Sequence, residues 1–454
     1  MKARNLLFFL LGALTLSIYL ASCGEDRWPE YAVQTQTDRW IDDSMRVWYY
    51  WNEDMPSSKK LNYFSEPATF FKSLLSSEDK YSTIDSIIQL SPTRSALDLE
   101  YGYGIQFELD KVENNDTAYY ARILYTVKNS PAATANLSRG QWILSIDDKP
   151  ITKKNYTELY MGSGIKVVTG YYDSVKNTIL ANKSTTNIGA MTPLEDNPVY
   201  YYNTYTEGDN RIGYLVYNRF TPGTTANPTA YDQALLNVSK YFAGQNVNQF
   251  ILDLRYNNGG HLSSAQLLST ILAPSSALGK RLGYLEFNKQ STPRNQEFYL
   301  DQNLIPTGSN LNLNTLYILT SSQTASASEM LINCLKPYIP KIVLIGQTTV
   351  GKNVASKTFI NKDLQIAINP IVCKIYNSLG TSDYSSGFKA DYSLSEISDL
   401  KYYLPFGDTN EALLSKALSL ITNKSTSVNS TKSLRVSPII SSMTRKADRA
   451  VRLE

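Results

Sequence analysis

The alternation of apolar strands and amphipathic helices between Arg211 and Gly346 constrains the fold more than any other feature of the sequence. Its apolar runs are continuous, which is typical of strands buried on both faces of a parallel sheet. Strands that alternate with helices form a sheet with helices packed on both sides, so the sequence predicts an α/β fold. We expect strands at 211–217, 250–254 and 341–346, helices at 228–242 and 262–272, and a strand–helix–strand unit within 316–352.

The length of 454 residues predicts two or three domains, because one domain usually takes roughly 100 to 200 residues. The formal net charge of +3 is unevenly distributed. Residues 423–454 contain seven Lys or Arg and two acidic residues, so the rest of the chain has a net charge of −2. A body without basic excess makes nucleic acid a poor candidate partner. The 423–454 tail is Ser-rich and poor in aromatic residues, which predicts disorder.

Histidine occurs once, at His261, and cysteine three times, at Cys23, Cys334 and Cys373. A zinc site built from several such ligands cannot be assembled here, and we expect neither a metal site nor a cofactor. A Ser-His-Asp triad would have to use His261 as its base. We expect Cys334 and Cys373 to be buried small hydrophobic side chains rather than a redox pair. Nucleophilic chemistry in this chain therefore favours a base other than histidine.

Residues 1–22 have the pattern of a secretory signal peptide. Lys2 and Arg4 precede an apolar run at 6–20, which is shorter than the roughly 20 apolar residues of a membrane span. The run ends in Leu-Ala-Ser-Cys, which resembles the lipobox of bacterial lipoproteins. That resemblance implies that Cys23 is lipidated, so that the segment 23–35 links the mature chain to a membrane outside the cytoplasm. The alternative is an ordinary signal peptide with an incidental cysteine.

Residues 36–95 are expected to form a small N-terminal helical domain. Helical patterns occur at 37–51, 67–75 and 83–90, and four of the five tryptophans precede position 52. An aromatic stripe of this kind favours a core or a seam between domains over a ligand platform.

From about residue 96 to 185 the pattern changes to the alternation typical of strands. A glycine-rich segment enters the first of these strands, and Gly140 opens a later one that ends in an acidic turn. The region resembles a PDZ domain, which implies that backbone N–H groups bind the carboxylate of a peptide C-terminus beside an open strand edge. The alternative is a β-rich insertion without a ligand. The carboxylate-binding residues in this resemblance are Gly102, Tyr103, Gly104 and Ile105.

Two loops at expected carboxyl ends of strands are the candidates for chemistry, because sites of open α/β sheets collect there. The first, at 253–260, ends in Gly259 and Gly260. Adjacent glycines let the backbone approach a ligand and direct N–H groups at an oxygen. A tight turn without a ligand has the same sequence pattern.

The second loop, at 324–329, has the sequence TASASE and begins a helix. Small residues leave room for a substrate backbone, and Glu329 can accept hydrogen bonds at the helix start, although such a start is often only a cap. Lys352 follows the next strand, so Ser326 and Lys352 are expected on one edge of the sheet. A buried lysine can act as the base for a serine, because burial lowers the pKa of its amine.

Three motifs together resemble the C-terminal processing, or tail-specific, serine peptidases: DLRYNNGG at 253–260, TASASE at 324–329 and TTVGK at 348–352. The resemblance covers most of residues 36–421. It implies a crotonase-like core of ββα units at 186–422, joined to the PDZ-like β domain and the N-terminal helical domain. It also implies hydrolysis of peptide bonds near the C-termini of protein substrates, whose tails the PDZ-like domain recruits.

Carried over by position, the resemblance implies that Ser326 is the nucleophile and Lys352 the general base. It implies an oxyanion hole made by backbone N–H groups of Ala327 and of the glycine pair. Within that pair, Gly259 is preferred over Gly260.

Three positions depart from the family pattern or keep an alternative open. Several family members have a glutamine four residues after the lysine to orient it, whereas this chain has Ser356, whose hydroxyl has a shorter reach. His261 directly follows the glycine pair and remains a rival base. The family's Gly-x-x-Pro-Asp segment lacks its proline at 387–391, which we interpret as a structural difference.

The sequence therefore predicts a lipid-anchored, extracytoplasmic serine endopeptidase at the periplasmic face of a bacterial membrane or at the cell surface. Its expected partners are proteins or peptides with free C-termini and the membrane that holds the anchor at Cys23. The alternative, which Ser356 favours, is a peptidase-fold lipoprotein with little or no activity that binds peptides or acts as a scaffold.

Overall fold

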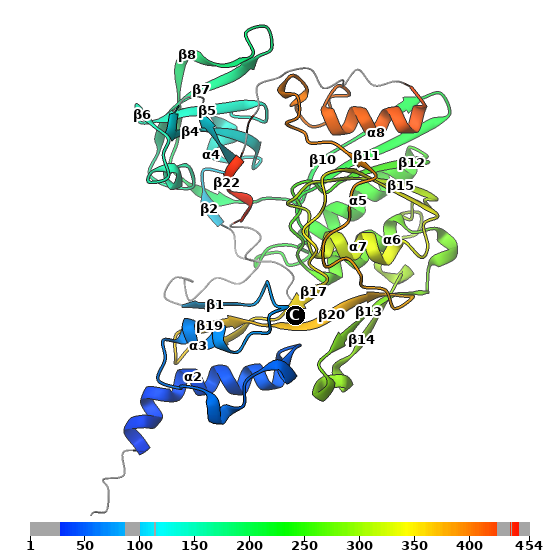
Figure 1. The fold of residues 1–454 in the computed structure, drawn as a ribbon. Helices are drawn as coiled ribbons and strands as arrows, with labels where there is room; N and C mark the ends of the chain where they lie inside the picture. Colours follow the sequence, from blue (N-terminus) through cyan, green and yellow to red (C-terminus); the bar gives the residue numbers. More distant parts are fainter. Residues whose placement is uncertain (1–27, 87–99, 113–114, 425–435, 437, 445–454) are drawn as a thin grey trace, which may run out of the picture.

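The computed structural model describes residues 28–86, 100–112, 115–424, 436 and 438–444. Figure 1 shows three parts: an N-terminal domain at the bottom, a β domain at the upper left, and a larger α/β region on the right. The predicted α/β class is confirmed.

The N-terminal domain packs two helices against a three-stranded sheet of order β1-β19-β18. Ile41 and Met45 of α2 and Tyr49, directly after its end, recur every four residues and are buried in one cluster with Phe70 and Phe71 of α3, as expected for one apolar face of a helix. The helical patterns near 37–51 and 67–75 are therefore confirmed. The elements are α2 (Trp28–Trp48), α3 (Pro67–Ser73), β1 (Thr83–Ser86), β18 (Phe359–Asn361) and β19 (Ile366–Asn369).

The predicted helix at 83–90 is wrong in its described part. Thr83–Ser86 forms β1, which pairs antiparallel with β19. The segment contains one apolar residue, Ile84, so its pattern does not distinguish a strand from a helix. The edge of β19, which comes from a distant part of the chain, supplies the backbone hydrogen-bond partners. Residues 87–90 lie outside the described part of the chain.

The β domain is a sheet of order β22-β3-β4-β5-β7-β8, with β6 paired to β5. Phe107, Leu109, Ile123 and Ile143 are fully buried in its core. The strands predicted for this part of the chain are present. The elements are β2 (Glu100–Gly102), β3 (Ile105–Val112), β4 (Asn115–Thr126), α4 (Pro131–Thr134), β5 (Gln141–Ile146), β6 (Lys149–Pro150), η3 (Tyr156–Leu159), β7 (Ile165–Asp173), β8 (Thr178–Ile188) and β9 (Thr192–Leu194).

The predicted disorder of the 423–454 tail is wrong for one short segment. Residues Pro438–Ser441 form β22 and pair antiparallel with β3 of the β domain. The composition of the tail predicts that it cannot build a core of its own, but an existing strand edge provides backbone partners that composition does not reveal. The tail residues 425–435, 437 and 445–454 lie outside the described part of the chain.

The α/β region is built on a sheet of order β10-β11-β12-β15-β16-β21, in which all neighbours except β10 and β11 are parallel. The predicted parallel sheet is confirmed. The carboxyl ends of β12, β15 and β16 lie side by side, because these strands are consecutive neighbours. The strands are β10 (Val199–Glu207), β11 (Asn210–Tyr217), β12 (Gln249–Asp253), β15 (Thr315–Thr320), β16 (Lys341–Gly346) and β21 (Tyr392–Ser393).

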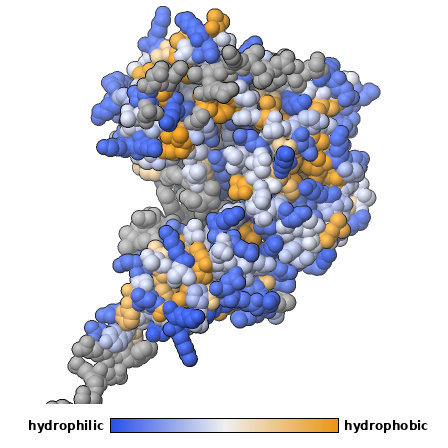
Figure 2. Space-filling model, in the orientation of Figure 1, coloured by the Kyte–Doolittle hydropathy of each residue, from blue (hydrophilic) through white to orange (hydrophobic). Residues whose placement is uncertain are grey.

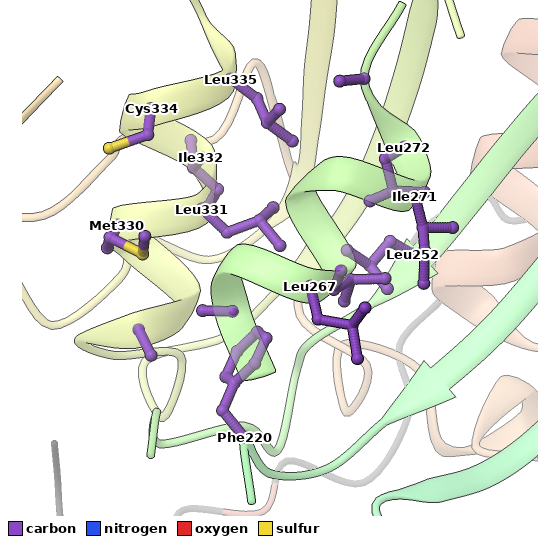
Figure 3. Packing of buried hydrophobic residues seen from close by; sticks show 14 of the residues in the cluster. Phe220, Leu252, Leu267, Ile271, Leu272, Met330, Leu331, Ile332, Cys334 and Leu335 are labelled. Carbon is purple, nitrogen blue, oxygen red and sulfur yellow. The ribbon is translucent and has the colours of Figure 1, made fainter. Parts of the chain in front are cut away.

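Helices cover both faces of this sheet. Leu252 packs in one cluster with α5, α6 and α7, whereas its neighbour Ile251 packs in another with α8. Figure 3 shows Leu331 and Leu335 of α7 directed toward α6. The helices are α5 (Ala230–Gly244), α6 (Leu262–Leu272), α7 (Ala327–Leu335) and α8 (Ala412–Thr422).

A second sheet, of order β14-β13-β20-β17, packs against the side of α7 that carries Cys334. Cys334 and Cys373 are buried free thiols, and burial raises the pKa of both. The strands are β13 (Arg281–Phe287), β14 (Gln296–Tyr299), β17 (Val354–Ser356) and β20 (Ile371–Asn377). The remaining short helices are η1 (Asn52–Asp54), η2 (Ser58–Lys60), η4 (Ser275–Ala277), η5 (Lys289–Arg294), η6 (Gln302–Leu304) and η7 (Leu400–Tyr402).

Figure 2 shows that the surface is hollowed between the β domain at the upper left and the N-terminal domain at the lower left. Apolar residues on this face are scattered among hydrophilic ones. Within the described residues, every helix is too short or too polar to cross a membrane.

Candidate active site

Ser326 lies at the turn between β15 and α7, directly before the first helical residue. Its φ of 61° and ψ of −111° are rarely adopted by residues with a side chain and cost of order 1–3 kcal/mol. Its Oγ is buried, and no other group among the described residues hydrogen bonds to it. Ser326 and Glu329 are placed as in a capping box, in which Glu329 accepts a hydrogen bond from the Ser326 N–H. A strained backbone and a buried hydroxyl without a partner indicate a functional position.

Glu329, the third residue of α7, connects the Ser326 turn to the loop that carries Lys352. Its Oε2 accepts hydrogen bonds from the backbone N–H groups of Ser326 and Lys352, both at 2.8 Å. Its Oε1 accepts hydrogen bonds from Gly351 N at 2.6 Å and from Thr349 Oγ1 at 2.5 Å. Burial raises the pKa of the carboxyl, and these four hydrogen bonds oppose the rise. One buried carboxylate thus fixes the two loops relative to each other.

Lys352 is buried, with 6% of its surface exposed. Burial lowers the pKa of its amine to about 8, and the negative charges of Asp79 and Glu329 oppose this shift. Nζ lies 5.3 Å from the centroid of the Tyr81 ring. Because Tyr81 lies two residues before β1, the N-terminal domain helps to enclose the amine. An amine with this pKa is substantially neutral at mildly alkaline pH.

The 253–260 loop is hydrogen bonded to the Ser326 turn. The fully buried Asn257 accepts bonds at its backbone oxygen from Ala325 N at 3.1 Å and from Ser328 Oγ at 3.0 Å. Its Nδ2 donates to the carbonyl of Tyr217 at 2.8 Å. Further bonds join Thr324 Oγ1 to Leu254 O, Asn258 Nδ2 to Gln323 O, and Ser321 Oγ to Arg255 O.

Gly259 and Gly260 have φ values of 106° and 139°. A Cβ on Gly259 would lie 2.8 Å from Ser326 Cβ, and one on Gly260 would lie 1.8 Å from the carbonyl oxygen of Phe220. Both the dihedral angles and the close approaches therefore require glycine.

The preference for Gly259 as an oxyanion donor is not supported by its contacts. Its N–H already donates to Asn257 Oδ1 at 2.8 Å. Among the described residues, no acceptor is found for the N–H of Gly260 or of Ala327. Ala327 is the first residue of α7, whose N–H has no partner within the helix. These two N–H groups are the better candidates for binding an oxyanion.

Arg255, inside the 253–260 loop, belongs to a buried ionic network. Its guanidinium lies 2.8 Å from Asp253, 2.9 Å from Glu396 and 2.6 Å from Glu411. Arg139 of the β domain lies 2.7 Å from the same Glu396 oxygen. Burial alone would raise the pKa of Glu396, but Arg139 and Arg255 lower it to about 2. The β domain is thus linked through Glu396 to the loop that carries the glycine pair.

The structure brings Ser326 and Lys352 into one site through Glu329, with Gly259 and Ala327 packed against the Ser326 turn. Ser326 Oγ is not hydrogen bonded to Lys352 or to the rival base His261. Hydrogen bonds of this kind are often long in ligand-free enzymes and shorten when substrate binds.

The positions of the other predicted site residues are as follows. Ser356 is buried on β17, beside β20. The 102–105 segment lies at the start of β3, where Tyr103 N donates to the carbonyl of Tyr160 at 3.0 Å. That N–H is therefore occupied in this structure. Cys23 lies outside the described residues.

Several contributors to the site were not predicted from the sequence. Glu329 was expected to serve only the start of its own helix, but it also binds the Lys352 loop. Asn257 belongs to the DLRYNNGG motif at 253–260, and its position two residues before the glycine pair is the only signal of its role. Tyr81 gives no signal in the sequence, because only the folding of β1 onto β19 brings it to Lys352.

Comparisons with known proteins agree with this arrangement. The model of peptidase family S41 matches residues 211–394, and the model of the S41 N-terminal domain matches residues 36–83. A crystal structure from Bacteroides fragilis NCTC 9343, described as a candidate S41 protease, is 40% identical to this chain. The alignment covers 85% of this chain and 97% of that one, with a TM-score of 0.77.

More distant structures align over a similar length. The photosystem II D1 C-terminal processing protease shares 16% identity over 85% of this chain and 98% of its own, with a TM-score of 0.48. Mature CPAF shares 12% identity over 88% of this chain and 98% of its own, with a TM-score of 0.45. The comparison with curated proteins found no match. On the family models and the 40% identical relative, which confirm the resemblance drawn from the motifs, this chain belongs to peptidase family S41.

Proposed function

We propose that this S41 peptidase cleaves proteins near their C-termini, with Ser326 as nucleophile and Lys352 as general base. The observation that supports this most is the position of Glu329, whose single oxygen accepts hydrogen bonds from the backbone of both residues. The strained, unpartnered Ser326 and the lowered pKa of Lys352 are further support.

In the first half of the reaction, Ser326 Oγ attacks the carbonyl carbon of the scissile bond, and the neutral amine of Lys352 accepts the hydroxyl proton. The carbonyl oxygen becomes an oxyanion that accepts hydrogen bonds from the N–H groups of Ala327 and Gly260. The Lys352 ammonium then donates its proton to the departing amine as the C–N bond breaks. An ester on Ser326 remains.

In the second half, Lys352 accepts a proton from water as the water oxygen attacks the ester. The same two N–H groups stabilise the second oxyanion. When the C–O bond breaks, Ser326 regains its proton and the product leaves as a carboxylate. The buried position of Lys352 favours the neutral amine with which each half of the reaction begins, because burial disfavours the charged form.

The β domain would recruit substrates by adding an extended peptide to the edge of β3, in the manner of a PDZ domain. The tight entry to β3 supports this role: Gly104 has a φ of 80°, and a Cβ there would lie 2.3 Å from Ser130 Cβ. In this proposal Gly104 and Ile105 lie at the end of the β3 edge where the substrate carboxylate binds.

The sequence Leu-Ala-Ser-Cys supports a lipid anchor at Cys23 and a location outside the cytoplasm. Fractionation of cells that express the full chain tests this. A Cys23→Ser variant should move from the membrane fraction to the soluble extracytoplasmic fraction. Unchanged membrane attachment of Cys23→Ser would refute the anchor without affecting the proposed chemistry.

The proposed activity is tested with an internally quenched peptide that has a free, apolar C-terminus. Ser326→Ala should lower kcat/KM by about 10⁴-fold or more, as loss of a nucleophile does in other serine peptidases. Ser322→Ala is a matched control, because Ser322 is an exposed serine of the same turn. Equal cleavage by wild type and Ser326→Ala would instead favour a peptide-binding or scaffold protein.

A further inference from the structure

The outer edge of β3 is occupied by a segment of the chain itself. In β22, Pro438 lies opposite Asp110, Ile440 opposite Leu109 and Ser441 opposite Glu108. The pairing is antiparallel, so β22 runs toward the start of β3 and the 102–105 segment. A peptide that binds by strand addition with its C-terminus at that glycine-rich entry would run in the same direction.

Ser442 continues the pairing beyond β22. Its N–H donates to the carbonyl of Phe107 at 2.9 Å, and its Oγ accepts a hydrogen bond from Phe107 N at 2.9 Å. The Ser442 hydroxyl in turn donates to Gln106 Oε1 at 2.9 Å. Both backbone groups of Phe107 on the outer edge of β3 are therefore used by the tail.

The apolar side chains of this segment pack into two different hydrophobic clusters. Ile440 packs against the core of the β domain, as do Tyr156 and Tyr160. Met443 is fully buried in a cluster that includes Tyr256 of the 253–260 loop. Ile439, by contrast, is 39% exposed. Inward and outward side chains follow one another, as in a strand added to a sheet.

We propose that residues 438–444 are an internal ligand of the β3 edge, and that a substrate tail must displace them to bind there. The proposal rests on the proposed recruiting role of the β domain. Strand addition depends on backbone hydrogen bonds, so the bonds to Phe107 can be made equally by another extended peptide. The kind of partner that this surface fits is an extended C-terminal segment with an aliphatic residue where Ile440 lies.

The internal ligand competes through its tether. Residues 423–437 connect it to α8. A segment tethered over so short a length of chain competes at an effective concentration on the order of 1 mM. If the tail segment itself has an intrinsic dissociation constant of about 0.1 mM for this edge, a free peptide binds about tenfold more weakly while the tail is present.

Peptide binding to the full chain tests the proposal, with Ser326→Ala in every variant so that no peptide is cleaved. The probe is a fluorescein-labelled peptide of residues 436–443, VSPIISSM, with a free carboxylate. The double variant Ile440→Asp, Ser442→Pro removes the core contact and the N–H that binds Phe107. The matched control is Ile439→Asp, which places the same charge at the exposed neighbour. Anisotropy gives the dissociation constant, and hydrogen exchange at Phe107 reports release of the tail.

The double variant should bind the probe about tenfold more tightly than the parent, and Ile439→Asp should bind within twofold of it. Equal binding by the parent and by a double variant whose Phe107 amide exchanges freely would overturn the proposal. Absence of binding to that released edge would overturn it as well. Neither result concerns the peptidase chemistry, which Ser326-dependent cleavage tests separately.

A second measurement uses the tail without substitution, in case the double variant does not fold. Saturating probe added to the Ser326→Ala chain should increase hydrogen exchange in residues 438–444, because the probe takes their place on β3. Binding of the probe without any change in that exchange would show two separate sites and overturn the proposal.

Discussion

Glu329 binds Lys352 through the backbone: Glu329 Oε2 accepts a 2.8 Å hydrogen bond from the Lys352 N–H, and the same oxygen accepts one from Ser326 N. The lysine side chain therefore remains available for proton transfer while its backbone is fixed. The carboxylate also holds Thr349 and Gly351, so the whole turn before the lysine depends on it. This arrangement makes Glu329 a positioning residue for the proposed catalytic pair.

Replacing Glu329 with alanine should therefore affect both stability and activity. The change leaves several buried donors without an acceptor, at about 1–3 kcal/mol for each. We expect the free energy of unfolding to fall by about 3–5 kcal/mol in urea titrations, and kcat/KM to fall by about 100-fold or more because 1 Å misplacements cost this much.

Glu329→Gln should lose less of both quantities, because it keeps one acceptor oxygen. Glu78→Ala, a change at an exposed glutamate, is the control and should leave both unchanged. Full activity in Glu329→Ala would rule out the positioning role.

Ser326→Gly and Ser326→Ala should both be inactive but should differ in stability. The φ of 61° and ψ of −111° are strained for alanine as for serine, whereas glycine adopts them readily. The glycine variant should be the more stable of the two by about 1 kcal/mol. Thermal unfolding of the two variants side by side measures the difference. A less stable glycine variant would argue against strain at this position.

Replacing Lys352 with methionine should remove the free-energy cost of burying its charged amine, and this cost depends on pH. The pKa of Lys352 is lowered to about 8 in the folded chain, against about 10.4 for an unperturbed lysine. Between these values the unfolded chain binds more protons, so the lysine's contribution to stability rises with pH and its full cost is present below pH 8.

The methionine variant should accordingly be more stable than wild type at pH 7, by up to about 3 kcal/mol. The difference should shrink as the pH rises to 10.5. Urea unfolding across this range measures it. A difference that does not change with pH would contradict the lowered pKa.

Arg139→Met should weaken the attachment of the β domain to the 253–260 loop. Breaking a buried ion pair leaves an uncompensated charge and typically costs 3–5 kcal/mol. The variant should also unfold at a higher pH in acid, because Arg139 helps to lower the pKa of Glu396 to about 2. A carboxyl group whose pKa is lower in the folded chain than in the unfolded chain stabilises the fold at every pH above its unfolded pKa. This contribution is lost as the pH falls through the folded pKa.

Near-UV circular dichroism from pH 6 to 2 follows this loss. Arg211→Ala is the control, since Arg211 is exposed. An unchanged acid transition in Arg139→Met would show that the network does not stabilise the fold.

The elements with long periodic patterns could be predicted from the sequence. The helix at 262–272 and the strand at 341–346 agree with the structure at both ends, because each is a sustained apolar run that the fold buries. Segments whose structure depends on a distant partner could not. Thr83–Ser86 and Pro438–Ser441 are strands only because β19 and β3 offer them an edge.

The same distinction applies to the site. Ser326 and Lys352 follow consecutive parallel strands, so their shared edge could be inferred from the chain order. The hydrogen bond that removes Gly259 as a donor depends on the rotamer of Asn257, which no pattern predicts. Tyr81 comes to the amine of Lys352 only through the packing of the N-terminal domain.

The pH dependence of kcat/KM for the quenched peptide, in wild type and in Ser326→Ala, tests the central claim most directly. If neutral Lys352 is the base, the rate should rise about tenfold per pH unit and level off at about pH 8, and Ser326→Ala should show no cleavage at any pH. A rate that levels off near pH 6.5, the unperturbed pKa of histidine, would identify His261 as the base, and cleavage that persists in Ser326→Ala would refute the nucleophile.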